Sequence, residues 1–169
     1  MSIISLEASW SAICEVVSSG QASSLYCAIA TVGEDGQPNV TPIGTVFLRA
    51  NQTGFFFDRY TSVLSSNLST NNRICLLAVN SGKAYWFRSL LVGQFKSPPG
   101  VRLYGTASAM RQATPEELSQ VESRVRKSRW LRGARMLWSD FEYVRDLDFT
   151  SFRPVSYPVM MHGLWPNAA

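Results

Sequence analysis

The segment from residue 24 to residue 80 constrains the fold most, because turn residues divide it into short strands and one helix. β-Branched and aromatic residues are frequent in 25–32, a composition that is typical of a strand. The next four residues, 33–36, read Gly-Glu-Asp-Gly and favour a hairpin turn into a partner strand at 38–48. The sequence therefore predicts an antiparallel β-hairpin at the start of a sheet.

A second polar turn, at 49–54, ends in glycine and leads into a short aromatic strand at 55–58. Residues 61–71 place apolar side chains on one helical face and serines on the other. Residues 73–79 are almost continuously apolar, as in a central strand. We expect an antiparallel meander whose helix crosses over a barrel between two strands.

The remaining chain continues this α+β pattern. The predicted elements are a helix at 5–20 that ends at Gly20, a bent strand at 101–110 around Gly105, a helix from Thr114 to about residue 129, a second helical piece at 130–138, a strand at 141–153 and an irregular tail at 154–169. Thr114 as N-cap, Pro115 at the first helical position and Glu117 three residues after the cap form a helix-start signal. Residues 85–95 are compatible with a strand or a loop. We expect residues 1–169 to form a single, mainly β domain whose barrel core spans about 24–153.

Composition limits the classes of protein that the chain can represent. A length of 169 residues with 46% hydrophobic residues suits one globular core, and a net charge of +4 favours small anions without indicating nucleic acid. The cysteines Cys14, Cys27 and Cys75 are far apart, odd in number and in apolar contexts, which indicates buried thiols rather than disulfides or a metal site. We find no secretory signal and no apolar run of about 18 residues, so we expect a cytoplasmic protein that does not span a membrane.

Pro42 and Gly44 interrupt an otherwise regular strand. Proline has no N–H for the ladder and glycine has no side chain to pack, so this strand is expected to be bulged or to lie at a sheet edge. Free backbone groups there could receive a planar ring. The alternative is an ordinary irregularity of an edge strand.

The junction between the aromatic strand and the helix carries Arg59, Tyr60, Thr61 and Ser62. Backbone N–H groups at a helix start, hydroxyls and a guanidinium can converge there on a phosphate. The alternative is a capped helix with a solvated arginine. Both interruptions occur one strand apart on a β-rich chain, which favours a phosphate-bearing cofactor.

These residues also carry a resemblance to a known family. The matching motifs are Cys27-Ala28-Ile29-Ala30-Thr31-Val32, Gly36-Gln37-Pro38, Thr41-Pro42-Ile43-Gly44, Asn67-Leu68 with Asn71, Arg73-Ile74 and Val101-Arg102-Leu103-Tyr104-Gly105-Thr106-Ala107. They resemble the pyridoxamine 5'-phosphate oxidase-like FMN-binding split β-barrels. The resemblance covers about residues 25–110 and implies a split barrel with flanking helices.

The resemblance also implies a cofactor, an assembly and a site. FMN would lie at the interface of a homodimer, with its ring on the second strand and its phosphate at the third strand and the following helix. By position, the ring contacts are Thr41, Pro42, Ile43, Gly44 and Thr45, and the phosphate contacts are Arg59, Tyr60, Thr61, Ser62, Ser66 and Asn67. Many members have a lysine or arginine where this chain has Val63 and Leu64, so Arg59 or the partner subunit would have to supply the positive charge.

The implied function is an FMN-dependent oxidoreductase that acts on a small molecule, with catalytic residues that the sequence does not identify. The alternative is a non-catalytic split barrel that binds flavin or haem, and a deazaflavin is another possible ligand. The lone histidine, His162, excludes a multi-histidine metal site and could be a haem ligand or an ordinary tail residue.

Six basic residues gather within 124–135: Arg124, Arg126, Lys127, Arg129, Arg132 and Arg135. A helix carrying them could bind nucleic acid or an acidic substrate near the flavin. Apolar residues such as Trp130 and Leu131 interrupt the run, which favours a solvated helix face. We therefore expect no specific binding of nucleic acid.

Overall fold

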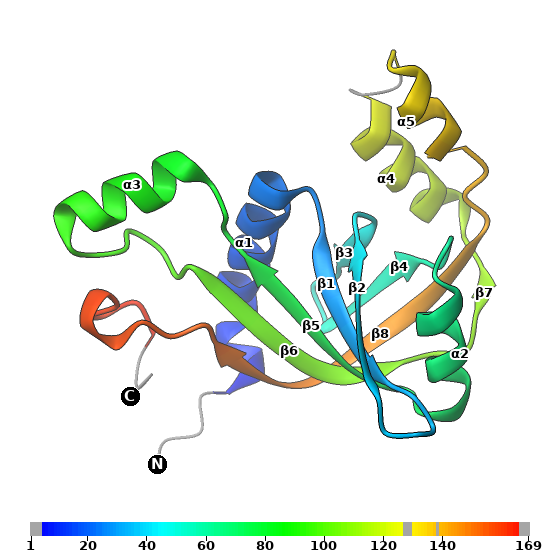
Figure 1. Cartoon of the computed structure of the whole chain (residues 1–169), viewed down its shortest axis with the longest axis horizontal. Helices are drawn as coiled ribbons and strands as arrows, with labels where there is room; N and C mark the ends of the chain where they lie inside the picture. The colour runs from blue at the N-terminus through cyan, green and yellow to red at the C-terminus, as the bar shows by residue number, and fades with distance from the viewer. Residues whose placement is uncertain (1–4, 127–129, 138, 166–169) are drawn as a thin grey trace.

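The structure is a computed structural model that describes residues 5–126, 130–137 and 139–165. A curled antiparallel sheet runs through it, with helices on its faces and at its ends (Figure 1). The strands are β1 (Cys27–Val32), β2 (Pro38–Ile43), β3 (Val46–Leu48), β4 (Thr53–Phe57), β5 (Arg73–Val79), β6 (Gly100–Ala107), β7 (Arg111–Gln112) and β8 (Tyr143–Pro154). The helices are α1 (Leu6–Ser24), α2 (Ser62–Thr70), α3 (Lys83–Val92), α4 (Pro115–Val125) and α5 (Arg132–Leu137), followed by the 3-10 turn η2 (Pro158–Met160).

The strand order is β2-β1-β5-β6-β8-β4-β3, with β7 paired to β8. β2 and β3 therefore form the two opposite edges of the sheet, although only Gly44 and Thr45 separate them in sequence. The single long strand that we predicted at 38–48 is wrong, because the chain leaves one edge after Ile43 and joins the other at Val46. Such a short link between opposite edges requires the sheet to curl almost into a barrel.

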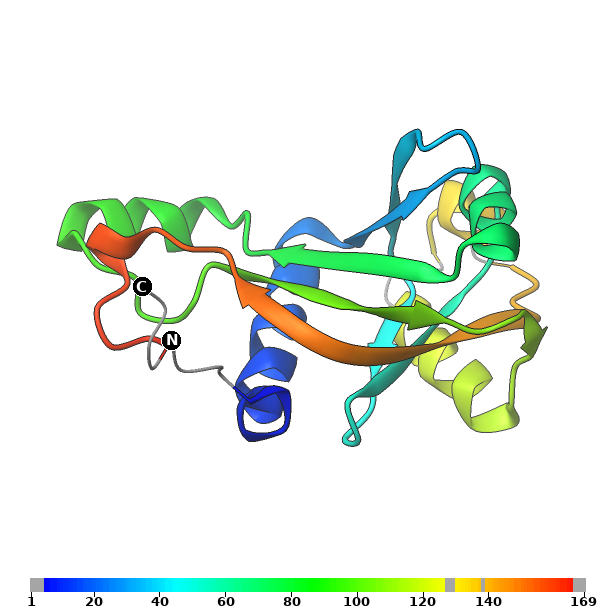
Figure 2. The ribbon, with the colours of Figure 1, turned by 90° about the horizontal axis from the view of Figure 1, so that it is seen from below.

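Helix α1 covers one face of the curled sheet and packs against β5 and β6 (Figure 2). We predicted that it ends at Gly20, but it continues to Ser24 and ends with Leu25 in the left-handed region, at φ 70°. Gly20 lies inside the helix, at a point where a Cβ would come within 3.1 Å of the Val79 backbone nitrogen. This glycine allows close approach of helix and strand instead of stopping the helix.

Strand β4 buries side chains on both of its faces. Phe56 belongs to the main core under α1, whereas Phe55 and Phe57 pack with Val121 and Val125 of α4. Successive side chains of a strand point to opposite faces, so one short aromatic strand holds two helices. This explains why 55–58 is so apolar in sequence.

Five other predictions can be compared with the structure. The strand at 73–79 and the bend in β6 are confirmed, the latter by a register shift between Tyr104 and Gly105. The start of α4 is also confirmed, since Thr114 and Glu117 form a capping box. The segment that we left open between strand and loop is the helix α3, and α4 ends at Val125 instead of near residue 129. Among the described residues, no helix is both long and apolar enough to cross a bilayer.

Candidate functional site

The predicted ring site lies on an edge strand. β2 has β1 on one side and is the last strand of the sheet on the other, which confirms the edge position of Pro42. Pro42 is exposed and lies opposite Ala28, with no register shift along the pair. The Thr41 hydroxyl accepts a hydrogen bond of 2.9 Å from the Asn39 amide, and Ile43 is buried.

The backbone just after β2 is less open than we predicted. The Arg124 guanidinium of α4 donates to the carbonyl oxygens of Gly44, at 3.2 Å, and Val46, at 2.6 Å. The buried Thr45 hydroxyl donates to the Phe57 carbonyl at 3.5 Å. The carbonyl oxygens of Gly44 and Val46 therefore already accept hydrogen bonds from within the chain. This corrects the expectation that backbone acceptors are free at this point.

Sequence reasoning missed the role of Arg124 because its contacts lie far away in sequence. The guanidinium carbon lies 3.7 Å from the centre of the Phe47 ring, and burial lowers the pKa of Arg124. The nearby Cys27 is buried, and burial raises the pKa of its thiol to about 12, although the Arg124 charge opposes this. Cys27 is thus a protonated core thiol near neutral pH, as the sequence indicated.

The predicted phosphate site is a tight bend before α2. Tyr60 lies in the left-handed region, at φ 59°, and receives a hydrogen bond of 2.8 Å from Arg59 Nη2 to its hydroxyl. The Arg59 guanidinium also lies 4.7 Å from the centre of the Tyr60 ring and 3.8 Å from the exposed Asp140 carboxylate. Arg59 Nη1 is buried and has no hydrogen-bond partner among the described residues. A buried donor of a charged group without a partner is unfavourable, so this nitrogen is suited to meeting an anion.

A buried ion pair lies beneath the same bend. Arg145 Nε on β8 is 2.5 Å from the Asp58 carboxylate, and the two side chains are only 7% and 4% exposed. The hydroxyls of Thr61 and Ser65 both donate to this carboxylate, and Arg145 Nη2 donates to the Ser65 hydroxyl at 2.8 Å. Thr61 is thus occupied with Asp58, and the pair neutralises the carboxylate that would otherwise repel a phosphate.

The other predicted phosphate contacts lie on α2. Ser62 begins the helix and Ser66 follows one turn later, and both are exposed. The Asn67 amide donates to the buried Thr31 hydroxyl at 3.0 Å, which ties α2 to β1. Because α2 packs against both β1 and β2, the structure brings the two predicted half-sites onto neighbouring elements.

The basic run at 124–135 is not one continuous helix. Arg124 lies in the last turn of α4, Arg126 caps that helix, and Arg132 begins the separate helix α5. Lys127 and Arg129 lie outside the described residues, and nothing is described for the side chain of Arg135. We predicted one helical piece to about residue 129 and a second from residue 130, and the structure describes two separate helices here, so no single helix carries the whole run.

Metal chemistry has no support in the described part of the chain. No group of three or more His, Cys, Asp or Glu side chains there could hold a metal ion. His162 is exposed in the tail, and its carbonyl accepts from the Gln94 side chain at 3.3 Å. Recognition of an organic anion by Arg59 and the helix start is the chemistry that these residues support best.

Comparisons with known proteins point to one family. The family model described as pyridoxamine 5'-phosphate oxidase matches residues 16–148. No curated protein matches the chain. The family match covers β1 to the first half of β8, and so includes both predicted half-sites.

Solved structures share the fold at low sequence identity. An FMN-binding protein from Syntrophomonas wolfei has a TM-score of 0.60 at 15% identity, covering 89% of this chain and 90% of its own. HupZ from Group A Streptococcus has a TM-score of 0.53 at 16% identity, with 83% and 91% covered. HutZ, the heme storage protein from Vibrio cholerae, has a TM-score of 0.51 at 16% identity, with 83% and 92% covered. At this level of identity the similarity establishes the fold alone.

Proposed function

The chain belongs to the pyridoxamine 5'-phosphate oxidase family, and from this premise we propose that it binds FMN and serves as an oxidoreductase for a small organic molecule. When bound, FMN supplies the capacity to transfer electrons or hydride. The protein's part is to hold the phosphate and the ring in place.

The observation that carries this proposal is the buried Nη1 of Arg59 at the start of α2, which has no hydrogen-bond partner in the described part of the chain. A phosphate there would give the guanidinium a charge-assisted hydrogen bond and would lie at the positive end of a helix. The Tyr60 backbone and the exposed hydroxyls of Ser62 and Ser66 are available on the same side of α2 as further contacts. We assign Thr61 and Asn67, which already bond within the chain, mainly to holding α2 in position.

The isoalloxazine ring would lie along the edge strand β2, from Thr41 to Thr45. β2 is next to α2, so one ligand could reach both. Since Arg124 fills two carbonyls beside this strand, it would keep the backbone fixed beneath the ring and leave ring contacts to the N–H groups and the Thr41 side chain.

A second copy of the chain would complete the site. Val40, Tyr60 and Val63 are apolar or aromatic and 55–72% exposed around β2 and the start of α2. Clustered exposed apolar groups favour burial against a partner. Leu64 lies at a position where many relatives have a cation, but here it is an apolar core residue that is 1% exposed. A positive charge from the partner subunit would therefore act on the phosphate together with Arg59.

Titration of the purified, ligand-free protein with FMN tests the proposal. Saturable binding with a flavin spectrum is expected, and Arg59→Gln should weaken it by about tenfold to a hundredfold, because a hydrogen bond to a charged group contributes about 1.5–3 kcal/mol. Arg73→Gln is the matched control, since it removes an exposed arginine at the start of β5, just beyond the C-terminal end of α2. Unchanged affinity in Arg59→Gln would show that the phosphate lies elsewhere.

The same measurement separates the alternatives. If the protein does not bind FMN but gives a Soret band with haem, the haem-binding alternative is supported. If it binds neither ligand, the FMN proposal and the haem-binding alternative are both contradicted. Light scattering with and without FMN tests the dimer. Turnover with a panel of reductants and acceptors then tests whether bound FMN is used in catalysis.

A further inference from the structure

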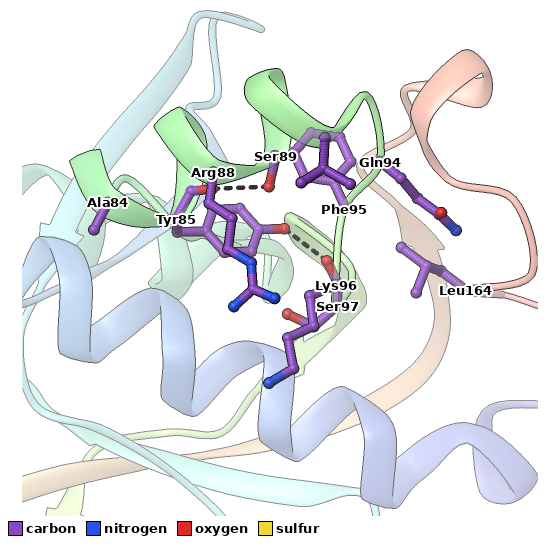
Figure 3. A pocket seen from close by; sticks show the side chains of 10 residues that line it. Ala84, Tyr85, Arg88, Ser89, Gln94, Phe95, Lys96, Ser97 and Leu164 are labelled. Atoms are coloured by element: carbon purple, nitrogen blue, oxygen red, sulfur yellow. Dashed lines mark hydrogen bonds between the residues drawn. The ribbon is translucent and has the colours of Figure 1, made fainter.

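A second pocket lies at the other end of β5 from the candidate FMN site. It has a volume of about 590 Å³ and is formed by α3, the loop that follows it, and Leu164 of the tail (Figure 3). β5 begins after α2 and ends before α3, so the two sites lie at opposite ends of one strand (Figure 1). A pocket of this size suits a small molecule, whose sites usually measure about 300–1,000 Å³.

Aromatic rings form the wall of this pocket and are held in place. The rings of Tyr85 and Phe95 are stacked, with centroids 5.6 Å apart and planes at 15°. The Tyr85 hydroxyl donates to the Ser97 carbonyl at 2.6 Å, and the Trp86 indole donates to the Asn80 carbonyl at 2.7 Å. The wall is therefore preformed, which reduces the entropic cost of binding a ligand.

Two cations reach this pocket without an internal counter-charge. Arg88 on α3 and Lys96 in the following loop extend toward the same side of the pocket in Figure 3. Neither side chain has an ion pair among the described residues, and no carboxylate lines the pocket. No Asp or Glu occurs between Asp58 and Glu116 in the sequence, so no carboxylate close in sequence can pair with Arg88 or Lys96.

We propose that this pocket binds a small organic anion with an aromatic body, such as an aryl carboxylate, independently of FMN. The ring of the ligand would pack against the half-buried Tyr85, which the buried Phe95 supports from behind, and its anionic group would pair with Arg88 and Lys96. Aromatic contact and charge pairing together determine the ligand class, because neither a neutral aromatic molecule nor a small inorganic anion would use both parts of the pocket.

The test is calorimetric titration of the full chain with 2-naphthoate as probe and naphthalene-2-methanol as its neutral counterpart. We expect saturable binding of 2-naphthoate, with at least tenfold weaker binding of the alcohol. Arg88→Gln and Lys96→Gln should each weaken 2-naphthoate binding about tenfold or more. Lys83→Gln removes a cation from the same helix outside the pocket and should leave the affinity unchanged.

Folding and site identity have their own controls. Arg88 and Lys96 are exposed, so we expect their variants to keep the melting temperature of the original protein. Titration in saturating FMN should give the same affinity for 2-naphthoate. Loss of binding in FMN would overturn the proposal by placing the probe in the FMN site. Equal binding of the alcohol, indifference to both substitutions, or no saturable binding would also overturn it.

Discussion

Two charged clusters fasten helices to β8, and they differ in burial and in charge balance. The α2 cluster depends on Arg145, whose buried guanidinium pairs with the buried Asp58 carboxylate. The α4 cluster depends on Asp146, the next residue of the same strand, which is about one-third exposed. Consecutive side chains leave a strand on opposite faces, so β8 anchors one helix from each face.

The α4 cluster is a closed network of two cations and two anions. Arg49 and Arg111 each contact both Glu117 and Asp146, at 2.6–3.0 Å. Glu117 also accepts from the Thr114 backbone N–H, which joins the network to the capping box of α4. Every charge in this cluster is matched within the chain.

The α2 cluster is not matched in this way. Asp58 pairs with Arg145. Among the described residues, the neighbouring Arg59 has one ion pair, the 3.8 Å contact with the exposed Asp140 carboxylate. The charges that hold α4 are thus all paired at short distance within the chain, whereas the start of α2 carries a cation, Arg59, whose carboxylate partner is 3.8 Å away and exposed. Four measurements test this difference between the two clusters.

Arg145→Met should have the largest effect, a loss of about 3–5 kcal/mol in the free energy of unfolding, because it leaves the Asp58 carboxylate buried without a positive charge beside it. Urea denaturation measures this. The double variant with Asp58→Asn should recover part of the loss, and Arg153→Met, an exposed position on the same strand, should cost little. If Arg145→Met were as mild as Arg153→Met, the buried pair would not anchor α2.

Glu117→Gln should cost about 1–2 kcal/mol, less than Arg145→Met, since Arg49 and Arg111 would still share Asp146. Glutamine can also keep part of the capping box. Glu116→Gln, in the same helical turn but exposed, is the matched control and should change the free energy by a few tenths of a kcal/mol. A cost of 3 kcal/mol or more would mean that the network lacks the redundancy described above.

The network should also make stability depend on acid. Hydrogen bonds from Arg111 lower the pKa of both Glu117 and Asp146. Their stabilising contribution is therefore fully present above the unfolded-state values of about 4, and it is lost as pH falls through the lower folded-state values. Unfolding free energies measured from pH 6 to pH 2 should decline more steeply for the original protein than for Glu117→Gln, and parallel curves would contradict this.

Arg59→Gln should have the smallest effect on stability, within about 0.5 kcal/mol without FMN, because the one ion pair of this side chain among the described residues is the 3.8 Å contact with exposed Asp140. Its unfolding midpoint in urea should therefore match that of the original protein, while its FMN affinity falls. A loss comparable to that of Glu117→Gln would place Arg59 with the structural charges.

Local signals in the sequence predicted much of the fold. The capping residues of α4, the apolar run of β5 and the bend at Gly105 act through neighbours in sequence, and each was found at its expected place. The predictions of a helix end at Gly20 and of open backbone at Gly44 were wrong, because contacts with residues distant in sequence determine the glycine at both positions. A Cβ on Gly20 would press on the Val79 backbone, and one on Gly44 would come within 3.1 Å of the Leu25 carbonyl.

The candidate site was predictable only in part, for the same reason. The bend around Arg59 is visible in sequence, because turn and helix-start residues are local. The partners that fix it are not, since Arg145 reaches Asp58 and Arg124 reaches Gly44 only after the sheet has curled. Arg145 is predicted to share one strand face with Leu147 and Phe149, and a charged residue on this otherwise apolar face is a sequence signal that could have marked it.

The position of β8 in the chain has a consequence for synthesis of the protein. β8 emerges late from the ribosome, yet β4 has no neighbour except β3 until β8 arrives, since Phe56 pairs with Arg145. At about 5–20 residues per second, the apolar strand Phe55 to Phe57 waits on the order of 10 s for its partner. During that interval the unpaired apolar strand is exposed and can be bound by chaperones. The yield of folded protein in the cell should therefore depend on the supply of chaperones, even if the finished protein is stable.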